Sequence, residues 1–204
     1  MKTDQQFAED IERGNTWELR LYEELSKYLY GLTEPEVAET FEGKVIGGFS
    51  YVPDIQVEQL VVANGGLDER FYGTQTASIE CKIRLGQFRF TSADDYPYPT
   101  VIVNEVYKTG PRNLTPSQYL ALSQDDQKAR MRPFHSYWIA SSDGNHVAVI
   151  CPATKPLWTQ KATYSPKDRR PALNWECPLR KPNGGPAVLF GRFPEDVRHL
   201  LTYL

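Results

Sequence analysis

The sequence has few cysteines, no long apolar run and no apolar leader, and each absence excludes a class of protein. Its three cysteines, Cys81, Cys151 and Cys177, are widely spaced and form no C-x-x-C pair, so neither a disulfide framework nor a cysteine-rich zinc site is expected. No stretch reaches the roughly 20 apolar residues of a membrane span. The start, M-K-T-D-Q-Q-F-A-E-D, is too charged for a secretory signal. We expect a cytoplasmic protein with reduced thiols and no membrane partner.

A positive net charge is also lacking. The 23 Lys and Arg against 26 Asp and Glu give a net charge of −3, which argues against a protein that coats DNA non-specifically. Beyond Lys155 the balance turns basic, and eight of the fifteen prolines lie between residues 152 and 194. We predict one domain over residues 1–204, with 152–204 as a Pro-rich, basic C-terminal extension that packs on it and holds little regular structure.

Hydrophobic periodicity predicts a helical start followed by strands. Residues 4–13 are expected to be helical, Gly14 to interrupt them, and a second helix to begin at Asn15, with Glu18 three residues later as in a capping box. Apolar residues recurring every three to four positions predict one buried face for this second helix: Trp17, Leu21, Leu25, Tyr28, Leu29 and Leu32. From Lys44 to Leu85 the pattern becomes that of β-strands.

The later half predicts further strands and one helix. The β-branched run within residues 100–107 predicts a buried strand. Thr115 followed by Pro116 predicts a helix that ends near Met131. Residues 136–141 and 146–151 flank Asp143-Gly144, a dipeptide typical of a β-hairpin turn.

The segment S-I-E-C-K-I-R-L, from Ser78 to Leu85, has the sharpest alternation in the chain. As a strand it places Ile79, Cys81, Ile83 and Leu85 on one face and Glu80, Lys82 and Arg84 on the other. The first face is suited to packing. The second presents an acid and an amine on a rigid element, with Asp68 twelve positions upstream of Glu80, a combination suited to metal-assisted hydrolysis of a phosphodiester.

The Glu-x-Lys pattern and its Asp equivalent occur elsewhere in the chain, so the surrounding residues decide which occurrence is a candidate site. Glu42-Gly43-Lys44 follows no Asp within thirty residues, and Asp126-Gln127-Lys128 lies in a predicted helix, where residues two apart point away from each other. Only Glu80 and Lys82 combine an amphipathic strand with an upstream Asp that follows a glycine turn.

In these residues, L-D-E-R-F-Y-G-T-Q-T-A-S-I-E-C-K-I-R, the chain resembles the core of the PD-(D/E)XK nuclease superfamily. The resemblance covers roughly residues 15–108. It implies an α/β fold with a restriction-endonuclease-like core, a central mixed β-sheet flanked by helices. It also implies that Asp68 and Glu80, with the backbone carbonyl of Cys81 and an acid on the preceding helix, Glu18, bind Mg²⁺ or Mn²⁺. Lys82 would position or activate the attacking water.

Some of these roles have a second candidate residue, and some of these residues have an alternative role. The literal Pro-Asp pair is Pro53-Asp54, but 25 residues separate Asp54 from Glu80, whereas only 11 separate Asp68 from Glu80. A short hairpin connection favours Asp68. Glu18 also fits a helix cap, with Glu23 as its nearest substitute on that helix. Contacts to DNA phosphates are expected, more weakly, from basic side chains that equally fit a solvated surface: Arg70, Arg84, Lys108, Arg169 and Arg170.

The expected function is that of a Mg²⁺-dependent deoxyribonuclease of the phage or mobile-element type, acting in the host cytoplasm if a phage encodes it. Its partner would be DNA, with a homodimer or a larger phage complex left open. The alternative is a catalytically inactive nuclease-fold protein that binds DNA or serves as a structural component. A third interpretation is an unrelated fold, in which Glu80 and Lys82 simply face solvent and are well exposed.

Overall fold

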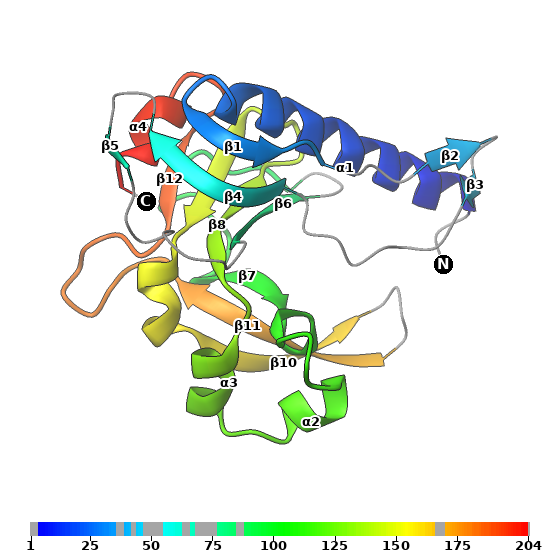
Figure 1. The fold of residues 1–204 in the computed structure, drawn as a ribbon, viewed down its shortest axis with the longest axis vertical. Helices are drawn as coiled ribbons and strands as arrows, with labels where there is room; N and C mark the ends of the chain where they lie inside the picture. The colour runs from blue at the N-terminus through cyan, green and yellow to red at the C-terminus, as the bar shows by residue number, and fades with distance from the viewer. Residues whose placement is uncertain are drawn as a thin grey trace.

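The structure, a computed structural model, describes residues 4–35, 39–41, 44–46, 55–62, 66–67, 77–84, 88–165 and 170–203. Within them the chain is a mixed α/β protein built around a seven-stranded mixed sheet, the main sheet (Figure 1). Its strands lie in the order β1 (Leu29–Thr33), β4 (Ile55–Val62), β6 (Ala77–Ile83), β8 (Phe134–Ala140), β9 (His146–Ile150) and β12 (Leu189–Arg192), and β5 (Gly66–Leu67) pairs with β4. Neighbouring strands are antiparallel except β6 and β8, which are parallel.

A second sheet of three strands lies below the main sheet in Figure 1. Its order is β10 (Thr159–Ser165), β11 (Arg170–Pro178) and β7 (Thr100–Glu105), all antiparallel. The short helices η2 (Val106–Thr109), α2 (Pro116–Leu120), α3 (Gln124–Arg130) and η3 (Pro152–Leu157) accompany this sheet, and β2 (Glu39–Phe41) pairs with β3 (Lys44–Ile46) apart from both sheets.

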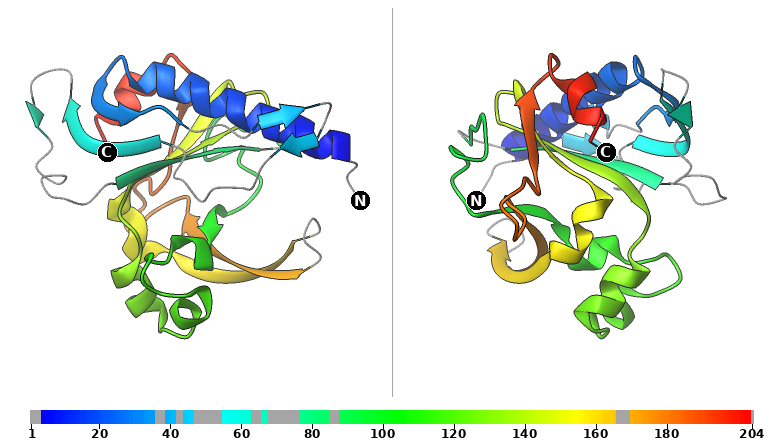
Figure 2. Two further views of the ribbon diagram at one scale, coloured as in Figure 1. Left: turned by 45° about the vertical axis from the view of Figure 1, so that its right-hand side comes forward. Right: turned by 90° about the vertical axis from the view of Figure 1, so that its left-hand side faces the viewer.

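The two faces of the main sheet are covered differently, as both views in Figure 2 show. Helices α1 (Asp4–Leu25) and α4 (Val197–Leu201) lie on one face and enclose the α1-side core, whose buried members include Trp17, Leu21, Leu25, Ile79, Trp138 and Leu200. The second sheet lies on the other face and encloses the inter-sheet core, which includes Phe90, Val101, Tyr137, Ile139, Trp158 and Trp175. The expectation of a mixed sheet is therefore confirmed; the long helix α1 covers one of its faces, and the second sheet with its short helices covers the other.

Helix α1 runs without a break from Asp4 to Leu25, so the predicted interruption at Gly14 is wrong. A glycine inside a helix costs about 1 kcal/mol relative to alanine. Burial of Trp17, Leu21 and Leu25 against the sheet exceeds that cost several times, at about 1.5–3 kcal/mol for each large side chain. The predicted helix is also too long at its C-terminal end, because Leu29 begins strand β1.

Strand β6 confirms the predicted alternation. Ile79 and Cys81 are buried in the α1-side core, and Ile83 packs against it. On the neighbouring strand β8, Trp138 and Ala140 belong to the same core, whereas Tyr137 and Ile139 belong to the inter-sheet core. The even-numbered residues of β6 therefore face away from α1.

The segment after residue 152 holds more regular structure than predicted. It supplies β10 and β11, two of the three strands of the second sheet, and β12, which pairs with β9 at the edge of the main sheet. The prolines of β11 lie at its ends, at Pro171 and Pro178, where a missing backbone N–H disturbs the strand least.

Two predictions for the middle of the chain have different outcomes. The hairpin around Asp143-Gly144 is confirmed as β8 and β9. The single helix after Thr115 is two short helices, α2 and α3, although Thr115 caps the first through a capping box with Gln118. Among the described residues, no helix combines the length and the apolar character that a membrane span requires.

Candidate functional site

The candidate site is the polar face of β6, which we define as Ser78, Glu80, Lys82 and the following Arg84. Glu80 pairs with Tyr137 of β8, and Lys82 pairs with Ile139. Ser78 pairs with Phe134 while Ile79 pairs with Ser136, so His135 is an additional residue that forms a bulge in β8. Bulges redirect side chains and occur often beside active sites.

Glu80 and Lys82 are both partly buried, and neither forms an ion pair with another described residue. Glu80 accepts one hydrogen bond, from the Ser78 hydroxyl at 3.2 Å. In the described part of the chain the Lys82 side chain makes no hydrogen bond or ion pair, and the Glu80 and Lys82 side chains form no ion pair with each other. Their Cα atoms are about 6.7 Å apart by the rise of a strand. A carboxylate and an amine withdrawn in part from water without a charged partner are costly to folding.

This partial burial bears on the interpretation in which both charges simply face solvent. That interpretation predicts two well-exposed side chains. Glu80 and Lys82 instead lie at intermediate exposure, beside the buried Tyr137 and Ile139. The polar face of β6 is therefore not an ordinary solvated strand surface.

Arg84 links β6 to the loop before β7. Its backbone N–H donates to the Ala140 carbonyl at 2.9 Å, its guanidinium donates to the Tyr96 hydroxyl at 3.3 Å, and it lies 5.4 Å from the centre of the Phe88 ring. Burial raises the pKa of Tyr96, so its hydroxyl stays protonated at neutral pH. Arg84 thus has a packing role, and its guanidinium is only partly accessible.

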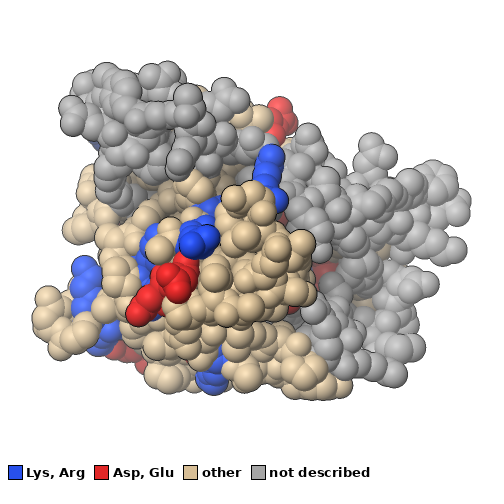
Figure 3. Space-filling model, turned by 60° about the horizontal axis from the view of Figure 1, so that its bottom comes forward, with Lys and Arg blue, Asp and Glu red and all other residues tan. Residues whose placement is uncertain are grey.

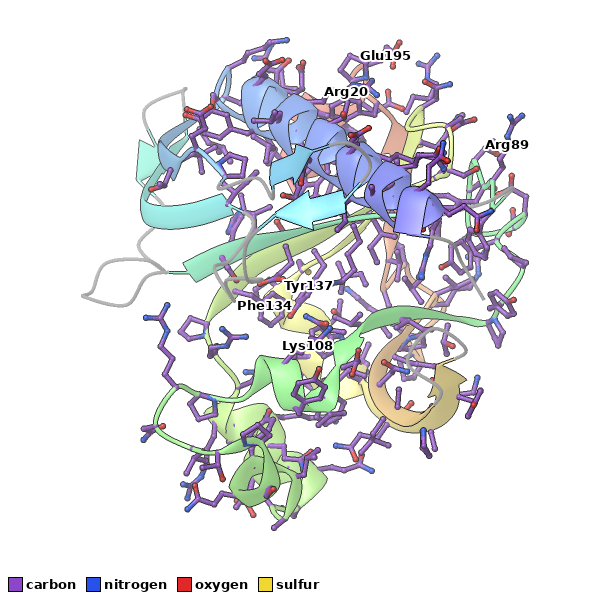
Figure 4. The ribbon with its side chains drawn as sticks, turned by 90° about the vertical axis from the view of Figure 1, so that its right-hand side faces the viewer. Arg20, Arg89, Lys108, Phe134, Tyr137 and Glu195 are labelled. Atoms are coloured by element: carbon purple, nitrogen blue, oxygen red, sulfur yellow. The ribbon has the colours of Figure 1, made fainter. Side chains whose placement is uncertain are left out.

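Lys108 and Glu18 lie on opposite sides of the main sheet. Lys108, on η2, pairs with Glu105 at 3.2 Å, and Figure 4 shows it on the same side of the main sheet as Phe134 and Tyr137. Glu18 lies on α1, which covers the opposite face. The structure therefore does not bring Glu18 beside Glu80 and Lys82.

The remaining predicted residues fall outside the description in whole or in part. Asp68, Asp54, Arg70 and Arg169 lie outside the described residues, and Arg170 is described only as the backbone of β11. The Cys81 side chain is buried in the α1-side core, and the ligand role that the resemblance implies for its backbone carbonyl stays a prediction. No three acidic, His or Cys side chains gather as a metal site within the described ranges.

The strand register adds information about the two candidate acids. Ile55, which follows Asp54 in the sequence, pairs with Ile79, which precedes Glu80. Leu67, which precedes Asp68, pairs with Val61. Val61 is six residues along β4 from Ile55, or about 20 Å at the rise of a strand. The predicted short hairpin from residue 67 to the Glu80 strand is therefore not the pairing that the structure shows.

Two neighbours of Glu80 were not predicted from the sequence. The Ser78 hydroxyl could have been found, since Ser78 lies two residues before Glu80 and so on the same strand face. Tyr137 comes from another strand, and its position depends on the bulge in β8, which no local pattern announces.

Comparisons of the chain with protein-family models, with curated proteins and with solved structures found no match.

Proposed function

We propose that this chain is a metal-dependent DNA nuclease with a restriction-endonuclease-like core, in which the polar face of β6 holds the catalytic carboxylate and amine. The observation that supports this most strongly is the pair Glu80 and Lys82, partly buried on one face of a central strand and without a charged partner among the described residues. The order of a long helix, the antiparallel strands β1, β4 and β6, and then β8 parallel to β6 supports the proposed core.

The donor groups suit Mg²⁺ or Mn²⁺, because these ions prefer oxygen ligands and keep several waters. Glu80 would hold the ion, together with the Cys81 carbonyl. When bound, the ion supplies charge neutralisation at the phosphate and lowers the pKa of water. The Lys82 amine donates hydrogen bonds either to the attacking water or to the phosphate oxygens that gain negative charge. Tyr137, which pairs with Glu80 across the neighbouring strand, is itself buried.

Asp54 and Asp68 both remain candidates for a second carboxylate. The register between β4 and β6 favours Asp54, because Ile55, which follows Asp54, pairs with Ile79, which precedes Glu80. This reverses the preference drawn from the sequence, where the shorter connection favoured Asp68.

The test is cleavage of supercoiled plasmid DNA with Mg²⁺ or Mn²⁺. Glu80→Gln and Lys82→Met should each reduce cleavage by about 10²- to 10⁴-fold. Glu195→Gln and Lys181→Met, which remove exposed charges elsewhere, should cleave like the wild type. Asp54→Asn should cost as much as Glu80→Gln if Asp54 is a ligand, and Asp68→Asn should then have little effect. Glu18→Gln should retain activity. Full activity of Glu80→Gln would refute the proposal.

The second candidate function is an inactive nuclease-fold protein that binds DNA or has a structural role. The lack of a group of three or more potential metal-binding side chains among the described residues favours it. On the face shown in Figure 3, Lys and Arg side chains are scattered rather than gathered in one basic field, so binding to that face should be weak. DNA binding by the wild type without cleavage in either metal would support this candidate.

A further inference from the structure

A hollow lies on the α1 side of the main sheet, away from Glu80 and Lys82. Its volume is about 270 Å³. Helix α1 contributes Arg13, Thr16, Trp17 and Arg20, the end of β6 contributes Ile83, and the β8–β9 turn contributes residues 142–144. The four helical positions are spaced by three, four and seven residues, so they share one face of α1.

Two guanidinium groups at this hollow have no carboxylate partner in the described residues. Arg13 and Arg20 are exposed, and neither takes part in an ion pair there. Arg20 is nevertheless held in place, 5.2 Å from the centre of the Phe193 ring and against the turn at Gly144. Figure 4 shows Arg20 on the α1 side of the sheet. A positioned guanidinium without an acidic partner is prepared for an external anion.

The acid of the turn does not neutralise these arginines. The carboxylate of Asp143 accepts the Ser141 hydroxyl at 2.5 Å and the Asn145 backbone N–H at 3.1 Å. Its nearest cation is Arg89, at 3.9 Å. The Ser141 hydrogen bond, foremost, lowers the pKa of Asp143, so this carboxylate stays ionised at neutral pH, with partners other than Arg13 and Arg20.

A third donor points to the same ligand class. Trp17 is 1% exposed, and its indole N–H is buried without a hydrogen-bond acceptor in the described structure. Buried N–H groups normally have partners, and this unpartnered one belongs to a side chain that lines the hollow. The Thr16 hydroxyl donates to the Glu12 carbonyl at 2.8 Å and can still accept a hydrogen bond.

We propose that this hollow, the α1 anion pocket, binds a phosphomonoester, with the phosphate between Arg13 and Arg20 and the organic group against Trp17 and Ile83. The donors outnumber the free acceptors, which suits a dianion, and the apolar walls suit its organic substituent. The phosphate could belong to an organic monoester or be inorganic phosphate, and affinity distinguishes these two sources.

The experiment is calorimetric titration of the full chain with phenyl phosphate and with inorganic phosphate. One molecule of phenyl phosphate should bind, at least tenfold more tightly than inorganic phosphate. Arg13→Gln and Arg20→Gln should each weaken binding about tenfold, and the double variant should abolish it. Arg112→Gln, an exposed arginine beyond the pocket, should bind like the wild type.

Three outcomes would overturn the assignment. The first is no saturable binding of phenyl phosphate. The second is binding that Arg13→Gln and Arg20→Gln leave unchanged while both variants unfold like the wild type. The third is tighter binding of a single-stranded oligonucleotide without terminal phosphates, which would make this face a nucleic-acid surface. Plasmid cleavage does not enter any of these readouts, so they are independent of the proposed nuclease function.

Discussion

Mutations on the two faces of β6 should change the free energy of unfolding differently. Lys82→Met keeps the length of the side chain and removes a partly buried ammonium that makes no hydrogen bond or ion pair in the described structure. Removing such a charge removes the free-energy cost of withdrawing it from water. The free energy of unfolding should therefore stay within about 0.5 kcal/mol of the wild type, or rise by up to about 1 kcal/mol, while cleavage is lost.

Ile79→Ala, on the opposite face, should be severely destabilising. Ile79 is 0% exposed in the α1-side core. The substitution removes three buried carbons, each worth about 0.8 kcal/mol, and leaves a cavity, so the expected loss is about 3–4 kcal/mol. Glu80→Gln retains an acceptor for the Ser78 hydroxyl and should cost less than about 0.5 kcal/mol.

Urea unfolding monitored by tryptophan fluorescence measures these differences. With an m-value of about 3 kcal/mol/M, Ile79→Ala should lower the midpoint by about 1 M, and Lys82→Met should leave it unchanged or higher. A loss of more than about 1.5 kcal/mol in Lys82→Met, at an unchanged m-value, would show that the amine stabilises the fold. The functional interpretation of the polar face would then be refuted.

Two further predictions concern ionisation. Burial raises the pKa of Cys177 to about 11, so iodoacetamide at pH 8 should modify Cys177 far more slowly than the half-buried Cys151. Mass spectrometry of the native protein after labelling measures the two rates. Equal rates would contradict the burial of Cys177. The pKa of Asp95 is lowered to about 2, because hydrogen bonds from Thr91 and Ser92 outweigh its desolvation. Its depressed pKa stabilises the fold above about pH 4, and this contribution is lost as the pH falls through 2. Asp95→Asn should therefore lower the free energy of unfolding at pH 7. The difference in free energy of unfolding between wild type and variant should shrink between pH 4 and pH 2, and a constant difference would refute the lowered pKa of Asp95.

Local patterns predicted the elements whose signal is local. The alternation in β6, the Asp143-Gly144 hairpin and the Thr115 cap depend on residues a few positions apart, and all three are confirmed. The break at Gly14 was wrong because tertiary burial of Trp17 and its neighbours outweighs a local preference.

The long-range arrangement could not be predicted in the same way. Nothing in the run from Thr100 to Glu105 shows that β7 joins the second sheet rather than the main one. The shared face of Glu80 and Lys82 follows from the strand period, but their relation to Glu18 depends on which face α1 covers. That choice is set by packing between distant segments.

The central claim, that a divalent ion binds at Glu80 on the polar face of β6, can be tested without DNA. Fe²⁺ takes oxygen ligands in place of Mg²⁺, and with ascorbate it generates radicals that cut the polypeptide near the ion. Mass spectrometry should locate cuts within a few residues of Glu80 that excess Mg²⁺ suppresses and Glu80→Gln abolishes. Cuts that persist in Glu80→Gln, or that lie only in segments remote from β6, would contradict the claim.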